Sequence, residues 1–86
     1  MKKALFLTLV TGENCPACEK MKKILDDIKY ELRLSYMVVD HSELPDIQRR
    51  AIRSIPVLIY NGGIIFTGCF GDAQQAKKFF INMNEK

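Results

Sequence analysis

The chain has 86 residues, of which 48% are hydrophobic and 27% charged, and it carries a net charge of +3. This length predicts one domain over residues 1–86, because a single hydrophobic core typically serves about 50–200 residues. The apolar fraction excludes a disordered chain, and three cysteines are too few for a secreted scaffold stapled by disulfides. Basic residues are scattered among acidic ones without interleaved aromatic rings, so no nucleic-acid partner is expected.

The N-terminus imitates a secretory signal peptide without completing the pattern. Met1-Lys2-Lys3 precedes the apolar run Ala4 to Val10, but this run is at the short limit for a signal peptide and no small-x-small cleavage site follows it. No run approaches the ~20 apolar residues of a membrane span. We therefore expect a soluble protein with no membrane partner. We also expect a cytoplasmic location, where a pair of cysteines stays reduced.

The first part of the chain predicts a strand, a helix and a strand. Leu5 to Val10 is a short apolar run without alternation, typical of a strand buried on both faces. After a turn at 11–14, apolar residues recur every three or four positions and predict a helix from about Pro16 to Leu32. Pro16 suits the first turn of that helix, where its missing N–H costs nothing. Tyr36 to Asp40 is a second compact strand.

A shorter helix is expected over Ser42 to Arg53. Pro45 suits its first turn, and three apolar residues are expected to face inward: Ile47, Ala51 and Ile52.

The last third of the chain predicts a hairpin and a final helix. Val57 to Tyr60 and Ile64 to Thr67 flank Asn61-Gly62-Gly63, and Asn-Gly between two apolar runs is a strong hairpin signal. A loop follows at Gly68 to Gly71. Asp72, with a glutamine three residues later, resembles a capping box at the start of an amphipathic helix.

The predicted order of elements is therefore β-α-β-α-β-β-α. Two strands joined through a helix are expected to be parallel by a right-handed crossover, whereas the hairpin strands are antiparallel. The expected product is an α/β fold with one four-stranded mixed sheet and helices on both faces.

The two cysteines of Cys15-Pro16-Ala17-Cys18 lie at the junction between the first predicted strand and the helix that follows it. Unpaired N–H groups and the helix dipole stabilise a thiolate at a helix N-terminus, so Cys15 is the expected nucleophile. Cys18 lies one turn further on, within reach of Cys15. Cys15 would attack a substrate disulfide, and Cys18 would then resolve the mixed disulfide.

Metal binding is the alternative use of this cysteine pair. A structural zinc site would need a second pair of ligands, and the chain offers only His41 and Cys69, which are separated in sequence. We therefore predict no metal site. A metal chaperone that uses Cys15 and Cys18 as soft ligands stays open as an alternative.

Two segments resemble the thioredoxin/glutaredoxin superfamily, and the resemblance extends over nearly all 86 residues. Cys15-Pro16-Ala17-Cys18 is similar to the active-site motif of that family, and Arg53-Ser54-Ile55-Pro56-Val57-Leu58 resembles the segment that carries its cis-proline. The resemblance implies a minimal thioredoxin fold. It also implies that Pro56 is cis and packs against the dithiol, with the Ile55 backbone pairing with an extended substrate.

Some features resemble glutaredoxins, namely the short length, the missing extra N-terminal strand and helix, and the Cys-Pro-x-Cys motif. Glutaredoxins that bind glutathione usually carry a basic residue ahead of the first cysteine and a Gly-Gly-x-x-Asp turn before the last helix. Here Gly12 stands three positions before Cys15, and the turn reads Gly68-Cys69-Phe70-Gly71-Asp72. These departures weigh against glutathione binding.

Other features resemble thioredoxins, including the Arg-Ser-Ile-Pro segment and the Asn-Gly-Gly turn. The match is again partial, because Asn14 replaces the aromatic residue that usually precedes the first cysteine. Leu9 replaces the buried aspartate that thioredoxins place six residues before it. The chain resembles most the short, glutaredoxin-sized thioredoxin-like proteins.

This resemblance implies a small thiol–disulfide oxidoreductase that reduces protein disulfides through Cys15 and Cys18. A flavoprotein thioredoxin reductase would recycle it with electrons from NADPH; the alternatives are a glutathione-dependent glutaredoxin and a non-catalytic thioredoxin-fold binding module. No bound cofactor beyond the redox-active disulfide is implied. A ribonucleotide reductase is a natural candidate substrate, and nothing in the sequence demands more than a monomer.

Seven residues around the dithiol are expected to contact substrate: Pro16, Ala17, Ile55, Pro56, Gly68, Cys69 and Phe70. Two of them have a second interpretation. Cys69 is either a small buried hydrophobe or an accessory thiol that can be glutathionylated or pair with Cys15, and Phe70 belongs either to an apolar rim around the dithiol or to the core.

Overall fold

The computed structural model describes residues 4–84. Its elements follow in the predicted order: β1 (Leu5–Thr11), α1 (Pro16–Leu32), β2 (Leu34–Asp40), a 3-10 turn (His41–Glu43), α2 (Asp46–Ala51), β3 (Val57–Tyr60), β4 (Gly63–Thr67) and α3 (Ala73–Asn84). Within residues 4–84, no helix is both long enough and apolar enough to cross a membrane.

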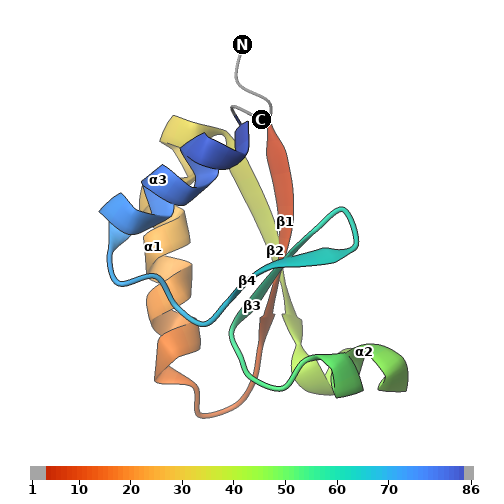
Figure 1. Ribbon diagram of the computed structural model, residues 1–86. Helices are drawn as coiled ribbons and strands as arrows, with labels where there is room; N and C mark the ends of the chain where they lie inside the picture. The colour runs from red at the N-terminus through yellow and green to blue at the C-terminus, as the bar shows by residue number, and fades with distance from the viewer. Residues whose placement is uncertain (1–3, 85–86) are drawn as a thin grey trace.

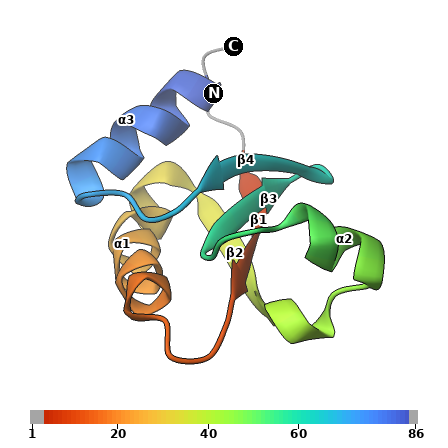
Figure 2. The ribbon, with the colours of Figure 1, turned by 60° about the horizontal axis from the view of Figure 1, so that its bottom comes forward.

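The four strands form one mixed sheet in the order β2-β1-β3-β4. β1 and β2 are parallel and pair over seven residues, from Leu5↔Leu34 to Thr11↔Asp40. β1 pairs antiparallel with β3, and β3 pairs antiparallel with β4. Helices α1 and α3 cover one face of the sheet, and α2 lies on the other side (Figures 1 and 2). The predicted fold class is confirmed.

The main core lies between the sheet and the pair α1 and α3. Leu5, Leu7 and Leu9 alternate along β1 and pack against buried residues of α1 and against Phe80 of α3. Apolar residues of α1 recur every three or four positions, so one stripe of the helix is buried: Cys18, Met21, Ile24, Leu25, Ile28 and Leu32. This packing fixes the N-terminus of α1 at the C-terminal end of β1.

The expectation that β1 is buried on both faces is wrong. Phe6 lies on the face opposite to Leu5 and Leu7, and 62% of its surface is exposed. Only Val10, near the end of the strand, is buried on that side, in a small second cluster with Ile52 and Val57. The reason is that α2 is too short to cover the whole face, which an apolar run in the sequence does not reveal.

The single helix expected over 42–53 is also wrong, because the segment forms a 3-10 turn followed by the six-residue α2. The Asp40 and Glu43 side chains form a capping box that closes the turn. Pro45 disfavours a helical conformation at the residue before it, and both Leu44 and Pro45 are extended. A second helix therefore starts at Asp46. It leaves Ile47 83% exposed and Ala51 exposed, and of the predicted inward residues only Ile52 is buried.

Candidate active site

The dithiol motif begins where the loop after β1 turns into α1. Asn14 adopts a positive φ of 51°, a conformation that asparagine tolerates better than most residues. This turn places Cys15 at the N-cap of α1, with Pro16 at the first helical position. The Cys15 sulfur accepts a hydrogen bond from the backbone N–H of Cys18 at 3.1 Å. A backbone N–H group in the first turn of α1 therefore points at the Cys15 sulfur.

Cys15 and Cys18 form a disulfide, and their Cα atoms are 5.2 Å apart. The two cysteines differ in access to solvent. Cys18 is 2% exposed, whereas Cys15 is partly exposed and lies in a shallow groove of about 440 Å³ lined by Gly12, Asn14, Cys15, Pro16 and Glu19. An incoming group can therefore reach Cys15 and not Cys18.

The predicted proline segment lies next to this loop. The Ile55–Pro56 peptide bond is cis, and Pro56 is buried. The Pro56 carbonyl accepts a hydrogen bond from the N–H of Gly68 at 2.7 Å. Gly68 has a φ of +94°, a conformation that favours glycine, so this residue allows the 68–71 loop to close onto Pro56.

Gly12 is a site residue whose role the sequence analysis missed. A Cβ atom at this position would lie 2.6 Å from Cδ1 of Ile55, closer than real Cβ atoms approach another heavy atom. The absence of a side chain at Gly12 thus lets Ile55 pack directly against the loop that leads to Cys15. The only signal in the sequence was a glycine within the turn before the motif, which does not name its contact.

His41 holds the other side of the proline segment. Its Nε2 atom lies 3.3 Å from the carbonyl oxygens of both Arg49 and Ile52, and because carbonyls only accept, the ring must donate from this nitrogen. A small groove of about 130 Å³ follows, lined by His41, Ile52, Arg53, Ser54 and Ile55. His41 therefore fixes the end of α2 ahead of the proline.

The structure does not bring all predicted substrate contacts to the surface. Pro16 is exposed, and Ala17, Ile55, Gly68 and Cys69 are partly exposed. Phe70 is only 4% exposed, and its ring stacks on Phe66 at a centroid distance of 4.1 Å within the main core. Of the two interpretations of Phe70, the structure thus shows the core position, because Phe66, Phe79 and Phe80 surround the ring.

Cys69 lies between the surface and the core. Its side chain is partly exposed and packs against the main core, and its thiol donates to the Phe70 carbonyl at 3.2 Å. It forms no disulfide within residues 4–84. Cys69 thus packs like a small hydrophobic residue and still has a thiol that solvent can reach.

Two side chains with shifted pKa values, Asp26 and Tyr36, lie on the flank of the sheet. Tyr36 donates a hydrogen bond of 2.7 Å to Asp26, and this bond lowers the pKa of Asp26 below its usual value. Burial and the same hydrogen bond raise the pKa of Tyr36 to about 12. Asp26 lies eight residues after Cys18, or about 12 Å along the helix axis. These shifts therefore stabilise the fold and are remote from the disulfide.

The part of the chain that the structure describes holds no cluster of metal ligands around the cysteines. No group of three or more His, Cys, Asp or Glu side chains there is arranged to hold a metal ion.

The model of the thioredoxin domain family matches residues 7–81. The chain belongs to this family. The predicted superfamily is thereby confirmed. The matched residues include most of β1, the dithiol, the proline segment and most of α3. A thioredoxin domain with a Cys-x-x-Cys disulfide is, at the level of the family, a thiol–disulfide oxidoreductase. No curated protein matches the sequence significantly.

Solved structures show the same fold. A malarial protein superposes on this thioredoxin domain with a TM-score of 0.66 at 16% identity, covering 95% of this chain and 98% of that one. Thioredoxin-2, a component of the malaria parasite's protein secretion machinery, gives 0.67 at 18% identity, covering 95% and 85%. Oxidised thioredoxin from Plasmodium falciparum gives 0.63 at 16% identity, covering 95% and 83%. At these identities the likeness establishes the fold alone.

Proposed function

We propose that this thioredoxin domain reduces disulfide bonds of protein substrates, with Cys15 as the nucleophile and Cys18 as the resolving thiol. The observation that carries the proposal is the difference in access between the two sulfurs at one helix terminus. Cys15 is partly exposed and its sulfur accepts the N–H of Cys18, whereas Cys18 is 2% exposed. A thiolate at the Cys15 position is stabilised by this donor and by the helix dipole.

The first chemical step forms a mixed disulfide. The Cys15 thiolate attacks one sulfur of the substrate disulfide, a new bond forms between Cys15 and that sulfur, and the other substrate sulfur leaves as a thiolate. The exposed Pro16 and the groove beside Glu19 leave the approach to Cys15 open. The buried Cys18 stays beneath, out of contact with the substrate.

The second step releases the substrate. The Cys18 thiolate attacks the Cys15 sulfur, the intramolecular disulfide forms, and the second substrate sulfur leaves. Two electrons and two protons have then moved from the dithiol to the substrate. A Cα–Cα distance of 5.2 Å lies within the range of protein disulfides, so the ring closes without unwinding α1.

The proline segment supports substrate binding beside the dithiol. Ile55 packs against Gly12, and so the backbone before Pro56 is held against the loop that leads to Cys15. An extended substrate segment would lie across this point, between the groove at Cys15 and the small groove at Ser54. Backbone pairing at such a site depends little on the amino-acid sequence of the substrate, which suits a protein that reduces many different disulfide proteins.

We propose a flavoprotein thioredoxin reductase as the electron source, with NADPH as the reductant, and a cytoplasmic setting. The support for this choice comes from the residues that glutathione binding would use. Gly12 stands where a basic residue would be expected, and a side chain at this position would displace Cδ1 of Ile55. The partly exposed thiol of Cys69 is compatible with a reducing compartment.

Cysteine variants test the chemistry. Cys15→Ser is expected to abolish reduction of insulin disulfides by dithiothreitol-coupled turnover, because no other exposed thiol lies at a helix N-terminus in the described chain. Cys18→Ser is expected to accumulate mixed disulfides that mass spectrometry detects at Cys15. Cys69→Ser is the matched control and keeps turnover. Retained turnover in Cys15→Ser would refute the proposed nucleophile.

A second experiment identifies the electron source. The oxidised protein is incubated with NADPH and a thioredoxin reductase, or with glutathione, glutathione reductase and NADPH, and consumption of NADPH is followed at equal protein concentration. We expect turnover at least about tenfold faster with the thioredoxin reductase. Faster turnover with glutathione would make the protein a glutaredoxin. Stoichiometric metal in freshly purified protein, without turnover in either system, would favour the metal chaperone.

A further inference from the structure

Strand β2 forms one edge of the sheet. Its inner side pairs with β1 over all seven residues, from Leu34 to Asp40, and no third strand within residues 4–84 pairs with its outer side. One row of backbone N–H and C=O groups of β2 therefore faces outward. Such a row is a template for pairing with another strand.

Apart from Asp40 at its C-terminal end, the β2 edge lacks the features that usually protect an edge strand. Natural edges carry lysine, proline or a bulge, but Leu34 to Val39 contains no charged residue and no proline, and the β1–β2 register has no irregularity. Met37 and Val38, on opposite faces of the strand, are 48% and 45% exposed. By contrast the other edge strand, β4, is shorter and follows a register shift at Leu58/Ile59.

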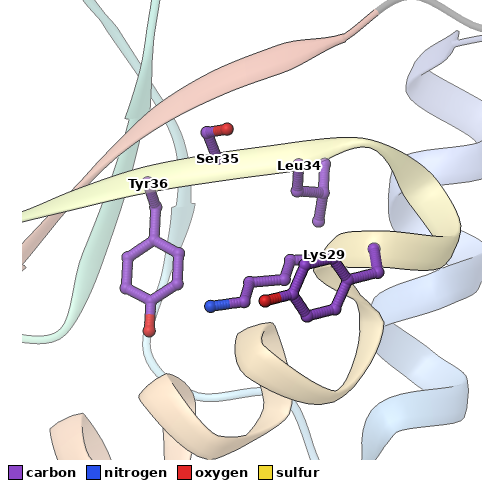
Figure 3. Close-up of a pocket in the computed structure, with 5 residues that line it drawn as sticks. Lys29, Leu34, Ser35 and Tyr36 are labelled. Atoms are coloured by element: carbon purple, nitrogen blue, oxygen red, sulfur yellow. The ribbon is translucent and has the colours of Figure 1, made fainter.

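A groove of about 460 Å³ runs beside the first half of β2. It is lined by Lys29, Tyr30, Leu34, Ser35 and Tyr36. Figure 3 shows the Lys29 side chain pointing toward Tyr36, on the side of the strand from which Leu34 projects. Lys29 already contacts Asp26 at 3.3 Å and lies 5.3 Å from the Tyr30 ring centre. The groove therefore holds a lysine, paired with Asp26 of its own helix, next to an open strand edge.

We propose that β2 pairs antiparallel with β2 of a second copy of this chain, so that two sheets join into one of eight strands. A two-fold axis through Met37 lets all seven residues of both strands pair. Met37 then lies opposite the partner's Met37, and Tyr36 lies opposite the partner's Val38. Pairs between aromatic and β-branched side chains are among the stabilising pairs of antiparallel sheets, and the exposed Val38 is covered.

The charges of the two copies complement each other in this arrangement. Residues 34, 36, 38 and 40 share one face of β2, and the partner's Asp40 lies opposite Leu34. Leu34 lines the groove that contains Lys29. One oxygen of each Asp40 carboxylate, Oδ1, caps the turn of its own chain through Ser42, so the other oxygen is the one that would face the groove with the lysine. Two-fold symmetry makes the contact twice. The net charge of +3 on each copy opposes association only weakly at physiological salt.

The dimer leaves both redox sites free. Cys15 follows the C-terminal end of β1, and β1 is parallel to β2, so Cys15 lies near the end of the sheet at which Asp40 is found. Because the two β2 strands are antiparallel, the two disulfides lie at opposite ends of the eight-stranded sheet. The proposal is therefore independent of the proposed function.

Sedimentation velocity over a range of protein concentrations tests the pairing. Wild-type protein is expected to pass from monomer to dimer as its concentration rises. Met37→Lys puts two lysines opposite each other and is expected to weaken the dimer at least about tenfold. Ile64→Lys is the matched control, because Ile64 is 49% exposed on the other edge strand, and it is expected to leave the dimer unchanged.

Cross-linking tests the register. Opposite residues of antiparallel strands have Cα atoms about 4.5–5.5 Å apart, which suits a disulfide. Met37→Cys in a Cys69→Ser background is therefore expected to form a covalent dimer in a glutathione redox buffer, whereas Ile64→Cys in that background is not. A wild-type protein that stays monomeric, a dimer that only Ile64→Lys dissociates, or equal cross-linking of both variants would overturn the proposal.

Discussion

On the face of the sheet that α1 and α3 cover, Leu5, Leu7 and Phe80 are almost entirely inaccessible to solvent. On the α2 face, Phe6 and Ile64 remain largely exposed, and the buried cluster contains only Val10, Ile52 and Val57. The first face supplies most of the hydrophobic stabilisation and fixes α1, which carries the disulfide. The second face is held by a few contacts that position the proline segment. The active site lies where these two unequal regions meet.

The largest difference between the faces is expected from two phenylalanine truncations. Phe80→Ala removes a fully buried ring from the α1/α3 face and is expected to lower the free energy of unfolding by about 3–5 kcal/mol. Phe6→Ala, on the α2 face, is expected to cost about 0.5 kcal/mol. Urea unfolding followed by circular dichroism measures both. Similar losses for the two variants would mean that the α2 face is as well packed as the other.

The contact between Gly12 and Ile55 joins the two regions, because Gly12 leads into α1 and Ile55 packs on the α2-face cluster. The atom that an added Cβ would meet is the terminal Cδ1 methyl of Ile55, so Gly12→Ala is expected to cost about 1 kcal/mol by overpacking and to slow disulfide reduction about two- to threefold. Ile55→Val removes the clashing Cδ1 atom. Turnover and urea unfolding are therefore expected to recover in the double variant, and no recovery would show that the contact is not the cause.

Tyr36→Phe tests a polar contact at the edge of the covered face. Loss of the hydrogen bond to Asp26 is expected to cost about 0.5–1 kcal/mol near pH 7. The folded pKa of Tyr36 is raised to about 12, so the contribution of this residue is complete below its unfolded pKa of about 10 and is lost as pH rises through 12. The lowered pKa of Asp26 makes its contribution present above the usual aspartate value and lost in acid. Urea unfolding of both proteins as a function of pH is the measurement, and a difference that persists above pH 12 would contradict this account.

The smallest change in the free energy of unfolding is expected from a substitution on α2. Ile47→Ser changes an 83% exposed side chain and is expected to alter the free energy of unfolding by less than about 0.5 kcal/mol. Ile52→Ser, five residues later and buried, is the matched control and is expected to cost about 2–4 kcal/mol. The midpoints of thermal unfolding compare the two. A large loss at Ile47 would show that α2 is covered in solution.

Local signals in the sequence were sufficient for much of the fold. The three- and four-residue spacing in 16–32, the Asn61-Gly62-Gly63 turn and the cysteine pair after an apolar strand each act over a few residues, and each is found where expected. The break before α2 is equally local, since Asp40, Glu43 and Pro45 define it. Pro45 alone does not reveal the break, because a proline also suits the first turn of a longer helix.

Other features depend on contacts between distant segments. Phe70 lies in the core because Phe66 and Phe79 approach it from β4 and α3, and Gly12 matters because Ile55 approaches it from 43 residues away. Neither contact has a periodicity or a motif that points to it. Burial on one or both faces of β1 likewise depends on how far α2 extends over the sheet.

The sequence by itself therefore determined the order of the elements, the parallel and antiparallel connections, and the position of Cys15 at a helix N-terminus, because these follow from short-range periodicity, turn chemistry and chain connectivity. Only the tertiary structure decided which sulfur is exposed, which face of the sheet stays open, and which edge is unprotected. These properties depend on how much surface each neighbouring element covers, and that is set by packing between residues far apart in the chain.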